Sequence, residues 1–313
     1  MIDRTDFNPA PGVFDQVAPG VRRMLAPNPS PMTFRGTNTY VVGQGRVAVI
    51  DPGPDDARHL AALEAALAGE VIGHILVTHA HRDHSPLARV LARRHAAPVL
   101  AFGGATAGRT PVMQRLARDG LAGGGEGADM PFVPDICLPD GAVIEGDGWR
   151  LVAHHTPGHM ANHMCFALDD LVFSGDHVMG WSTSMVSPPD GDLGAFLASC
   201  IRLRALAPRL LLPGHGAPVT DPAARLEALL AHRLQRTQQV LAALGPVPRP
   251  IPSITRSIYH DLAPTLIAAA ERNVFAHLID LVIKNHIHAV PRLAVTSSFR
   301  RPPDFRQIPL DAV

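Results

Sequence analysis

The stretch Thr78-His79-Ala80-His81-Arg82-Asp83-His84-Ser85 places three imidazoles and one carboxylate within six residues. It directly follows the apolar run His74-Ile75-Leu76-Val77, which is typical of a buried β-strand. Histidine and aspartate bind transition metals through nitrogen and oxygen, and clustering them at the end of a buried strand costs desolvation energy. The stretch therefore predicts a metal site.

The composition is that of a folded protein with a large core. The chain has 313 residues, of which 46% are hydrophobic and 18% are charged. The formal net charge of +0 excludes a whole-molecule attraction to nucleic acid or to anionic membranes. The three cysteines, Cys137, Cys165 and Cys200, show neither a disulfide framework nor a Cys-x-x-Cys pair. Because the N-terminus has no apolar signal segment and no run is long enough to span a membrane, we expect a cytoplasmic protein without membrane contact.

Strand and helix patterns alternate along most of the chain. After a Pro-rich lead-in over 9–31, we expect strands at 39–42, 47–50, 74–78, 149–153, 164–168, 171–174 and 209–212. We expect helices at 57–67, 86–95, 193–206 and 221–244, the last with Asp221 as N-cap and Pro222 in its first turn. This alternation predicts an α/β protein in which helices cover a sheet.

Two tracts interrupt this alternation. The glycine-rich segment 120–129 predicts a mobile surface loop, and whether it closes over a site as a lid is left open. The Pro-rich tract 245–252 predicts a stiff linker between a main domain, 1–245, and a C-terminal subdomain, 246–313. In that subdomain we expect helices at 256–262 and 266–283 and short strands at 287–295, and a winged-helix-like form is one arrangement of these elements.

Further polar residues occur directly after the apolar strands, where α/β enzymes place their chemistry. The complete set of candidate metal ligands is His79, His81, Asp83, His84, His159, Asp176 and His215. Seven nitrogen and oxygen ligands suit two metal ions that share one carboxylate, for which Asp176 is the candidate. We expect His79, His81 and His159 to bind one ion, and Asp83, His84 and His215 to bind the other. No thiolate is in the set, which favours two Zn²⁺ per chain and permits iron or manganese.

The motifs at 79–84 (HAHRDH), 156–159 (TPGH), 174–176 (SGD) and 213–215 (PGH) resemble those of the metallo-β-lactamase superfamily, over roughly residues 20 to 230. The resemblance implies an αββα sandwich with the site at one edge, between two β-sheets. Asp51 is similar to the acidic residue that lies beneath the metal loop in that superfamily. His155 and His177 adjoin ligand turns, so we expect them, with Asp51, behind the ligands. Trp181, Ser182, Thr183, Ser184 and Met185 follow Asp176 and are expected to line the substrate pocket.

A dinuclear site of this kind predicts a hydrolase. Two adjacent cations lower the pKa of a bridging water, so a metal-bridging hydroxide can attack a carbonyl or phosphoryl centre at neutral pH. Asp83 is the candidate catalytic residue that orients this water and carries its proton. The substrate is then a small molecule with an ester, thioester, lactone or phosphodiester bond.

The sequence does not fix one substrate. The chain resembles most the branch of the superfamily that contains a single-strand endoribonuclease and bacterial hydrolases of unassigned substrate, through 36–40, 174–180 and 269–278. RNA is therefore a possible partner, although the C-terminal part is only mildly basic. The sequence is also compatible with a promiscuous β-lactamase, and with a nucleic-acid-binding module that keeps a vestigial site. It is compatible with a dimer as well.

Overall fold

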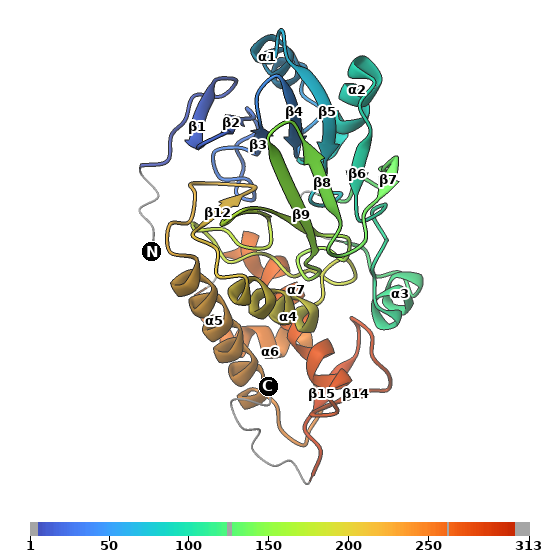
Figure 1. The fold of residues 1–313 in the computed structure, drawn as a ribbon. Coiled ribbons are helices and arrows are strands. Elements are labelled where there is room, and N and C mark those ends of the chain that lie inside the picture. Colours follow the sequence, from blue (N-terminus) through green and yellow to red (C-terminus); the bar gives the residue numbers. More distant parts are fainter. Residues whose placement is uncertain (1–5, 124–126, 262, 304–313) are drawn as a thin grey trace.

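The computed structural model describes residues 6–123, 127–261 and 263–303, and over these residues two β-sheets lie face to face (Figure 1). The seven-stranded sheet has the order β1 (Phe14–Ala18), β2 (Val21–Leu25), β3 (Asn38–Val42), β4 (Arg46–Ile50), β5 (Val71–Leu76), β6 (Val99–Ala101) and β7 (Ile136–Cys137). The five-stranded sheet has the order β12 (Leu210–Pro213), β11 (Leu171–Gly175), β10 (Met164–Leu168), β9 (Trp149–His155) and β8 (Val143–Gly146).

Alternation of side chains along the strands divides the core between these sheets from the cores outside them. In β4, Ala48 and Ile50 pack between the two sheets, whereas Val47 and Val49 pack on the opposite face. In β11, Phe173 points into the space between the sheets and Val172 points away from it. Both faces of each sheet are therefore apolar and must be covered.

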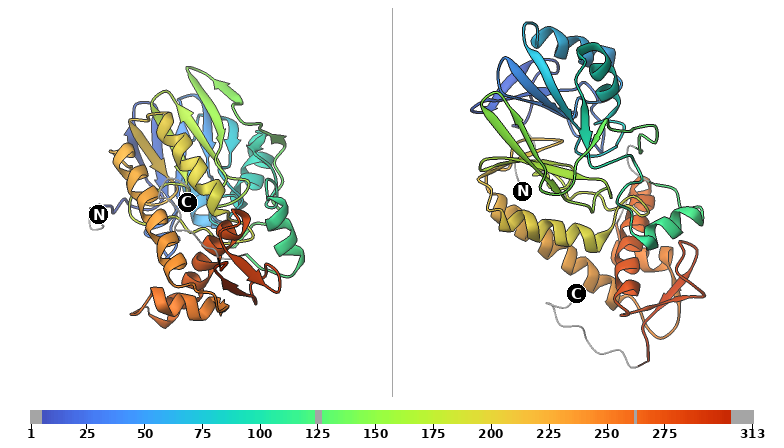
Figure 2. Two further views of the ribbon diagram at one scale, coloured as in Figure 1. Left: turned by 90° about the horizontal axis from the view of Figure 1, so that it is seen from below. Right: turned by 45° about the vertical axis from the view of Figure 1, so that its right-hand side comes forward.

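Helices cover the two outer faces (Figure 2). Helices α1 (Ala57–Ala66) and α2 (Pro86–His95) lie on the seven-stranded sheet, and α4 (Leu193–Ala205) and α5 (Pro222–Ala242) lie on the five-stranded sheet. Asp221 caps α5 by accepting a hydrogen bond from the Ala224 amide at 3.0 Å, and Pro222 occupies the first turn, as the sequence predicts. The expected αββα fold is confirmed. Among the described helices, none is long and apolar enough to cross a membrane.

The C-terminal part contains α6 (Ile251–Ile258), the short helix η1 (Pro264–Leu266), α7 (Ile267–Ile283) and a sheet of order β13 (Arg249–Pro250), β15 (Ser298–Arg300), β14 (His288–Val290). The linker prediction is wrong for the end of its tract, because residues 249–250 pair with β15 and residues 251–252 begin α6. Leu262, expected to end a helix, lies outside the described residues. The domain boundary at residue 245 stays a prediction.

Several regions of regular structure were not expected, among them the short strands β6 and β7. Strands β1 and β2 lie in the Pro-rich lead-in, where Arg22 and Arg23 interrupt the apolar pattern; Arg23 is nevertheless buried, ion-paired with Asp15 at 2.5 Å. Helix α3 (Pro111–Arg118) is short, and its Met113 and Leu116 belong to the same buried apolar core as residues of α5, α6 and α7. The local sequence of these segments did not predict their burial, because the residues that bury them lie far along the chain.

The glycine-rich segment 120–129 is described except for residues 124–126, which lie outside the described residues. Its last residues are held beside the predicted metal loop. The Gly127 carbonyl accepts from the Arg82 amide at 3.1 Å, and Ala128 forms an antiparallel bridge with His81. At its other end Gly123 lies so close to Asp190 that a Cβ would sit 2.0 Å from its carboxylate. The part of the segment next to the metal loop is thus hydrogen-bonded to it.

Candidate metal centre

The strand ends of both sheets meet at one edge of the sandwich. Strands β4 and β5 run parallel, as do β11 and β12, and β9 runs in the same direction as β11 because both are antiparallel to β10. The two sheets are joined at this edge, where the Met164 amide donates to the Thr78 carbonyl at 2.7 Å and Thr37 bridges His215. Residues that follow five different strands therefore converge, as proteins of α/β type arrange their sites.

The first cluster consists of His79, His81, His159 and Asp176, all buried. The Nδ1 atom of His81 lies 2.9 Å from Nε2 of His79 and 3.1 Å from Nε2 of His159. Asp176 Oδ2 lies 3.7 Å from Nε2 of His159. The nitrogen and oxygen atoms thus face one common point.

The second cluster consists of Asp83, His84, Asp176 and His215, also buried. His215 Nε2 lies 3.1 Å from Asp83 Oδ2 and 3.2 Å from Asp176 Oδ2. His84 Nε2 lies 3.2 Å from Asp83 Oδ2 and 3.5 Å from Asp176 Oδ1. Asp176 belongs to both clusters, which places them side by side.

These donor sets fit two metal ions. Four ligands at the usual zinc distances are separated from one another by roughly 3.3 Å in a tetrahedron, close to the separations in both clusters. Asp83 Oδ1 and Asp176 Oδ1 are buried without a hydrogen-bond partner among the described residues. Buried carboxylate oxygens without partners are costly. A bound cation would satisfy that of Asp176, and a water beside the cation would satisfy that of Asp83.

Four of the five candidate imidazoles are oriented by a group behind the ring. Asp51, directly after β4, accepts from the Thr78 amide and hydroxyl, both at 2.7 Å, and from His84 Nδ1 at 2.9 Å. The Thr78 hydroxyl in turn lies 2.9 Å from His79 Nδ1. These contacts leave Nε2 of His79 and of His84 facing the cluster, which is the usual arrangement of metal-binding histidines.

The other two supports are backbone carbonyls. His159 Nδ1 donates to the Met185 carbonyl at 2.7 Å, and His215 Nδ1 donates to the Gly36 carbonyl at 3.1 Å. Glycine is needed before both histidines. Gly158 has φ +149°, and a Cβ there would lie 2.3 Å from Phe196 Cα; at Gly214 a Cβ would lie 2.4 Å from Asp176 Oδ1.

The two clusters differ in charge. Burial lowers the pKa of His79 and of His159, and that of His81 to about 3, so these imidazoles are neutral at pH 7. Burial also disfavours charge on His215 and His84. There, however, the carboxylates of Asp176 and Asp83 prevail and raise the pKa of His215 to about 10 and that of His84 well above its usual range.

The carboxylates respond in the opposite direction. Burial alone would raise the pKa of Asp83 and of Asp176, but the adjacent His84 and His215 hold both pKa values well below the usual range. Both carboxylates are therefore ionised at neutral pH and are ready to bind a cation.

Comparison with known proteins agrees with this geometry. The sequence profile described as "Metallo-beta-lactamase superfamily" matches residues 32–215, more than half of the chain. The chain belongs to the metallo-β-lactamase superfamily. With relatives named as thioesterases, this member of the superfamily is a hydrolase.

Among its relatives is "Atrochrysone carboxyl ACP thioesterase" of Claviceps purpurea, 32% identical over 251 residues, or 78% of this chain and 71% of that one. Another is "Beta-lactamase-like protein 2 homolog" of Drosophila melanogaster, 32% identical over 278 residues, or 83% of this chain and 87% of that one. Several fungal relatives are longer, and the chain spans 65% of the thioesterase of Cryptosporiopsis. The structure of a "Beta-lactamase domain protein" from Burkholderia ambifaria superposes with a TM-score of 0.77 at 23% identity, over 95% and 96% of the two chains, and shows the same fold.

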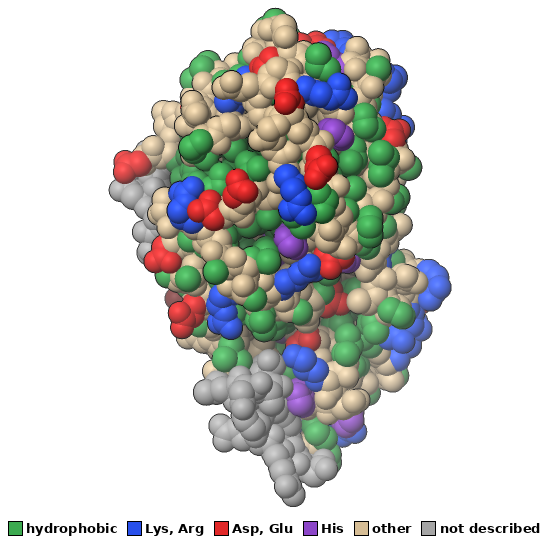
Figure 3. All heavy atoms as spheres, viewed as in Figure 1, with side chains coloured by type: hydrophobic (Ala, Val, Ile, Leu, Met, Phe, Trp, Pro, Cys, Tyr) green, Lys and Arg blue, Asp and Glu red, His purple; other side chains and the backbone are tan. Residues whose placement is uncertain are grey.

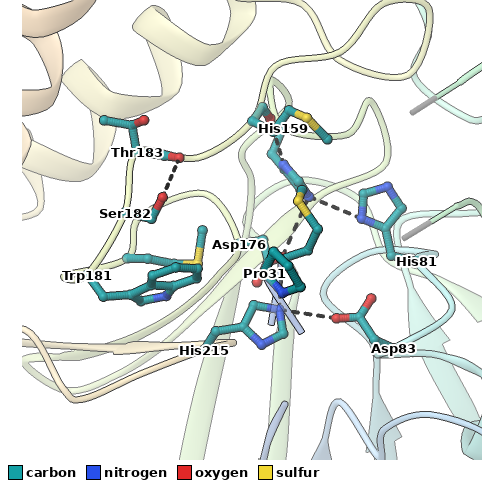
Figure 4. Close-up of a pocket in the computed structure, with 12 residues that line it drawn as sticks. Pro31, His81, Asp83, His159, Asp176, Trp181, Ser182, Thr183 and His215 are labelled. Carbon is teal, nitrogen blue, oxygen red and sulfur yellow. Dashed lines mark hydrogen bonds and ion pairs between the residues drawn. The ribbon is translucent and has the colours of Figure 1, made fainter. Parts of the chain in front are cut away.

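A narrow pocket of about 70 Å³ opens onto both clusters of this superfamily member (Figure 4). His81, Asp83, His159, Asp176 and His215 form its floor. Trp181, Ser182, Thr183 and Met185 line its wall as expected, together with Pro31, Met32 and Met179, which the sequence analysis did not identify. Ser184 does not line the pocket. Its side chain is buried and donates to the His177 carbonyl at 2.8 Å.

Of the residues expected behind the ligands, Asp51 contacts His84 directly. His177 lies one residue beyond Asp176, with its Nε2 atom 3.5 Å from Cys200 Sγ. His155 points elsewhere: it stacks on Phe102 at 3.8 Å, and its Nε2 donates to the Ala161 carbonyl at 3.0 Å. Sequence reasoning missed His163, whose fully buried ring centre lies 5.1 Å from that of His79. Its place four residues after His159 was the available signal.

Proposed function

We propose that this hydrolase uses a dinuclear zinc centre formed by the two clusters and that it cleaves thioesters. The observation that carries the dinuclear centre is Asp176, which belongs to both clusters: its Oδ2 lies 3.7 Å from Nε2 of His159 in the first and 3.2 Å from Nε2 of His215 in the second. A single buried carboxylate between two sets of imidazoles is the arrangement expected of a bridging ligand.

When bound, such a pair of cations would lower the pKa of water and polarise the carbonyl group of the substrate. Asp83 is placed to handle the proton. Its Oδ2 accepts from the Thr37 hydroxyl at 3.3 Å and faces His215, while its Oδ1 has no described partner and can accept the proton of the attacking water. As water oxygen bonds to the acyl carbon and the carbon–sulfur bond breaks, Asp83 returns this proton to the leaving sulfur, which yields a carboxylic acid and a thiol.

The pocket wall supports an acyl substrate. Met32, Met179, Trp181 and Met185 give it an apolar, thioether-rich surface, and none of the described residues that line it is lysine or arginine. The Trp181 indole is fixed by stacking on Phe34, with 5.0 Å between ring centres. Such a wall suits the hydrocarbon of an acyl group better than a phosphate.

On the face shown in Figure 3, the distribution of charge favours the same substrate class over RNA. Acidic and basic side chains are interspersed on the face shown in Figure 3, whereas a single-stranded nucleic acid needs a continuous basic track. The names of several relatives as carboxyl ACP thioesterases provide the further support for a thioester.

A hydrolysis screen of the zinc-loaded protein tests the proposal. Acyl-pantetheine thioesters, lactones, a cephalosporin and unstructured RNA are offered to the wild type and to Asp83→Asn, which keeps the size of the side chain but cannot accept the proton. We expect thioester hydrolysis with the highest kcat/KM, and a loss of roughly 10²–10⁴-fold in Asp83→Asn. Preferred cleavage of RNA or of the cephalosporin would overturn the substrate class, and full activity of Asp83→Asn would overturn the role of Asp83.

A further inference from the structure

Helix α5 contains a buried cation whose role the site described so far does not explain. Arg233 is 2% exposed, and among the described residues no carboxylate lies within ion-pair distance of it. Burial lowers its pKa to about 10, so it is still charged at neutral pH. An unpaired buried charge is costly, so its hydrogen bonds must contribute to the fold or to the site.

Those hydrogen bonds go to two distant segments. One guanidinium nitrogen donates to the carbonyl of Ser184, and another donates to Asn273 Oδ1 on α7 at 2.8 Å. The guanidinium also lies over the ring of Phe196 on α4, 5.1 Å from its centre. Arg233 therefore joins α4, α5 and α7 to the segment that follows Asp176.

That segment, residues 179–185, is the pocket wall, and we call it the wall loop. It contributes Met179, Trp181, Ser182, Thr183 and Met185 to the pocket. Arg225, two turns before Arg233 on the same helix, donates to the carbonyls of Met179 at 2.7 Å and of Ser182 at 2.6 Å. The two arginines thus hold three backbone carbonyls of the wall loop.

A fourth carbonyl of the wall loop supports a candidate ligand. The Met185 carbonyl, one residue after the carbonyl held by Arg233, accepts from His159 Nδ1 at 2.7 Å. This bond keeps the proton on Nδ1 and directs Nε2 to the first cluster. A shift of residues 184–185 would therefore turn the His159 ring.

We propose that Arg233 and Arg225 are positioning residues with separate tasks, an inference that rests on the proposed function. Arg233 fixes the end of the wall loop, and through the Met185 carbonyl it orients His159 for the metal in the first cluster. Arg225 fixes the beginning of the loop, and with it the Trp181 side of the substrate pocket. Through Asn273, the C-terminal helix α7 stabilises the metal centre without touching it.

Three arginine-to-methionine variants of α5 test this division. Arg233→Met and Arg225→Met each remove one positioning residue. Arg236→Met is the matched control, because the Arg236 guanidinium lies 4.2 Å from the centre of the Tyr259 ring and makes no described hydrogen bond to the wall loop. Zinc affinity of the metal-free proteins, amide hydrogen exchange of residues 179–185, and kcat and KM for a thioester are measured for each.

We expect Arg233→Met to lower the affinity for one of the two zinc ions about 10–100-fold, the usual effect of losing a group that supports a ligand. Arg225→Met should keep both affinities and raise KM with little change in kcat. Both variants should speed amide exchange in the wall loop, and Arg236→Met should change none of these quantities. A merely structural role would lower thermal stability in Arg233→Met and leave its zinc affinity and loop exchange at wild-type values, which would overturn the proposal.

If Arg233→Met does not fold, Asn273→Leu replaces it. This variant keeps Arg233 and removes its α7 partner, together with the hydrogen bond from Asn273 to the Tyr259 hydroxyl at 3.3 Å. It should give a smaller loss of zinc affinity in the same direction, and an unchanged affinity would overturn the proposal. Zinc affinity and exchange are measured without substrate. A wild type that cleaves no thioester would therefore contradict the proposed function while leaving this test intact.

Discussion

The two clusters of the candidate metal centre differ in the protonation of their histidines. The first cluster contains three imidazoles whose pKa values are lowered by burial. These imidazoles are neutral, so they do not need to release a proton when they bind a metal ion. The second gathers two ionised carboxylates against His84 and His215, whose pKa values are raised and which are therefore protonated in the metal-free protein. The first cluster is ready for a cation, whereas the second holds protons in its place.

This difference teaches how the fold can stabilise two adjoining clusters of candidate metal ligands when no metal is bound. Two protonated imidazoles neutralise the charges of Asp83 and Asp176, which would otherwise repel one another at this buried edge. A cation entering the second cluster must displace those protons, because a histidine binds metal only through a neutral nitrogen. The two ions should thus bind with different dependence on pH.

The largest effect is expected from Asp176, the residue common to both clusters. Asp176→Ala should lower zinc content at both positions and reduce thioester kcat/KM about 10³-fold or more, because it removes a ligand from each ion. Metal analysis and steady-state kinetics measure this. Asp170→Ala is the matched control, because Asp170 is an exposed carboxylate in the turn between β10 and β11. If Asp176→Ala still binds two zinc ions tightly, Asp176 is not a ligand shared by the two ions.

Variants of one cluster should separate the two ions. His81→Ala affects the first cluster and His215→Ala the second, so each should hold about one zinc ion per chain where the wild type holds about two. Native mass spectrometry at neutral pH counts the ions directly. If either variant loses both ions while it is still folded, the clusters do not bind independently and the comparison fails.

The pH dependence of affinity should distinguish the clusters further. The His215 pKa of about 10 means that protons compete for the second cluster throughout the neutral range. Its zinc affinity should therefore rise with pH, by roughly tenfold per pH unit for each proton displaced. The first cluster should show no such rise between pH 7 and 8, since burial lowers the pKa of its histidines and they are already neutral there. Chelator competition of His81→Ala and His215→Ala across this range measures each slope alone, and equal slopes would contradict the assignment.

A smaller change is expected from the residue beneath the clusters. Asp51→Asn keeps the shape of the side chain but removes the charge that faces His84 Nδ1. Affinity for the second ion should fall about 10–100-fold, and affinity for the first should fall less, because Asp51 reaches His79 only through Thr78. Thr78→Val is the complementary variant, and it should weaken the first ion more than the second.

Much of the fold and of the centre followed from local signals in the sequence. The ends of strands are marked by apolar runs that stop at polar residues, and for this reason the seven candidate ligands could be named before the structure placed them together. Asp51 was named from its resemblance to the acidic residue of the superfamily. The ends of parallel strands meet at one edge of a sheet. Polar residues that follow separate strands could therefore be predicted to form one site.

The rest depends on contacts that no local pattern encodes. Arg233 and Arg23 resemble surface residues in sequence, yet both are buried by partners far along the chain. In the wall loop, the side on which each residue points is fixed by Arg225 and Arg233, so Ser184 could not be separated from its pocket-lining neighbours. Strands β1 and β2 and helix α3 were missed for the same reason.

Calorimetric titration of the metal-free wild type with Zn²⁺ at pH 7, in two buffers of different ionisation enthalpy, tests the central claim most directly. The account predicts two ions per chain, one bound with almost no proton release and one bound with the release of about two protons, from His84 and His215. Binding of a single ion, or of two ions without a buffer-dependent heat, would contradict a dinuclear centre made of one neutral and one proton-loaded cluster.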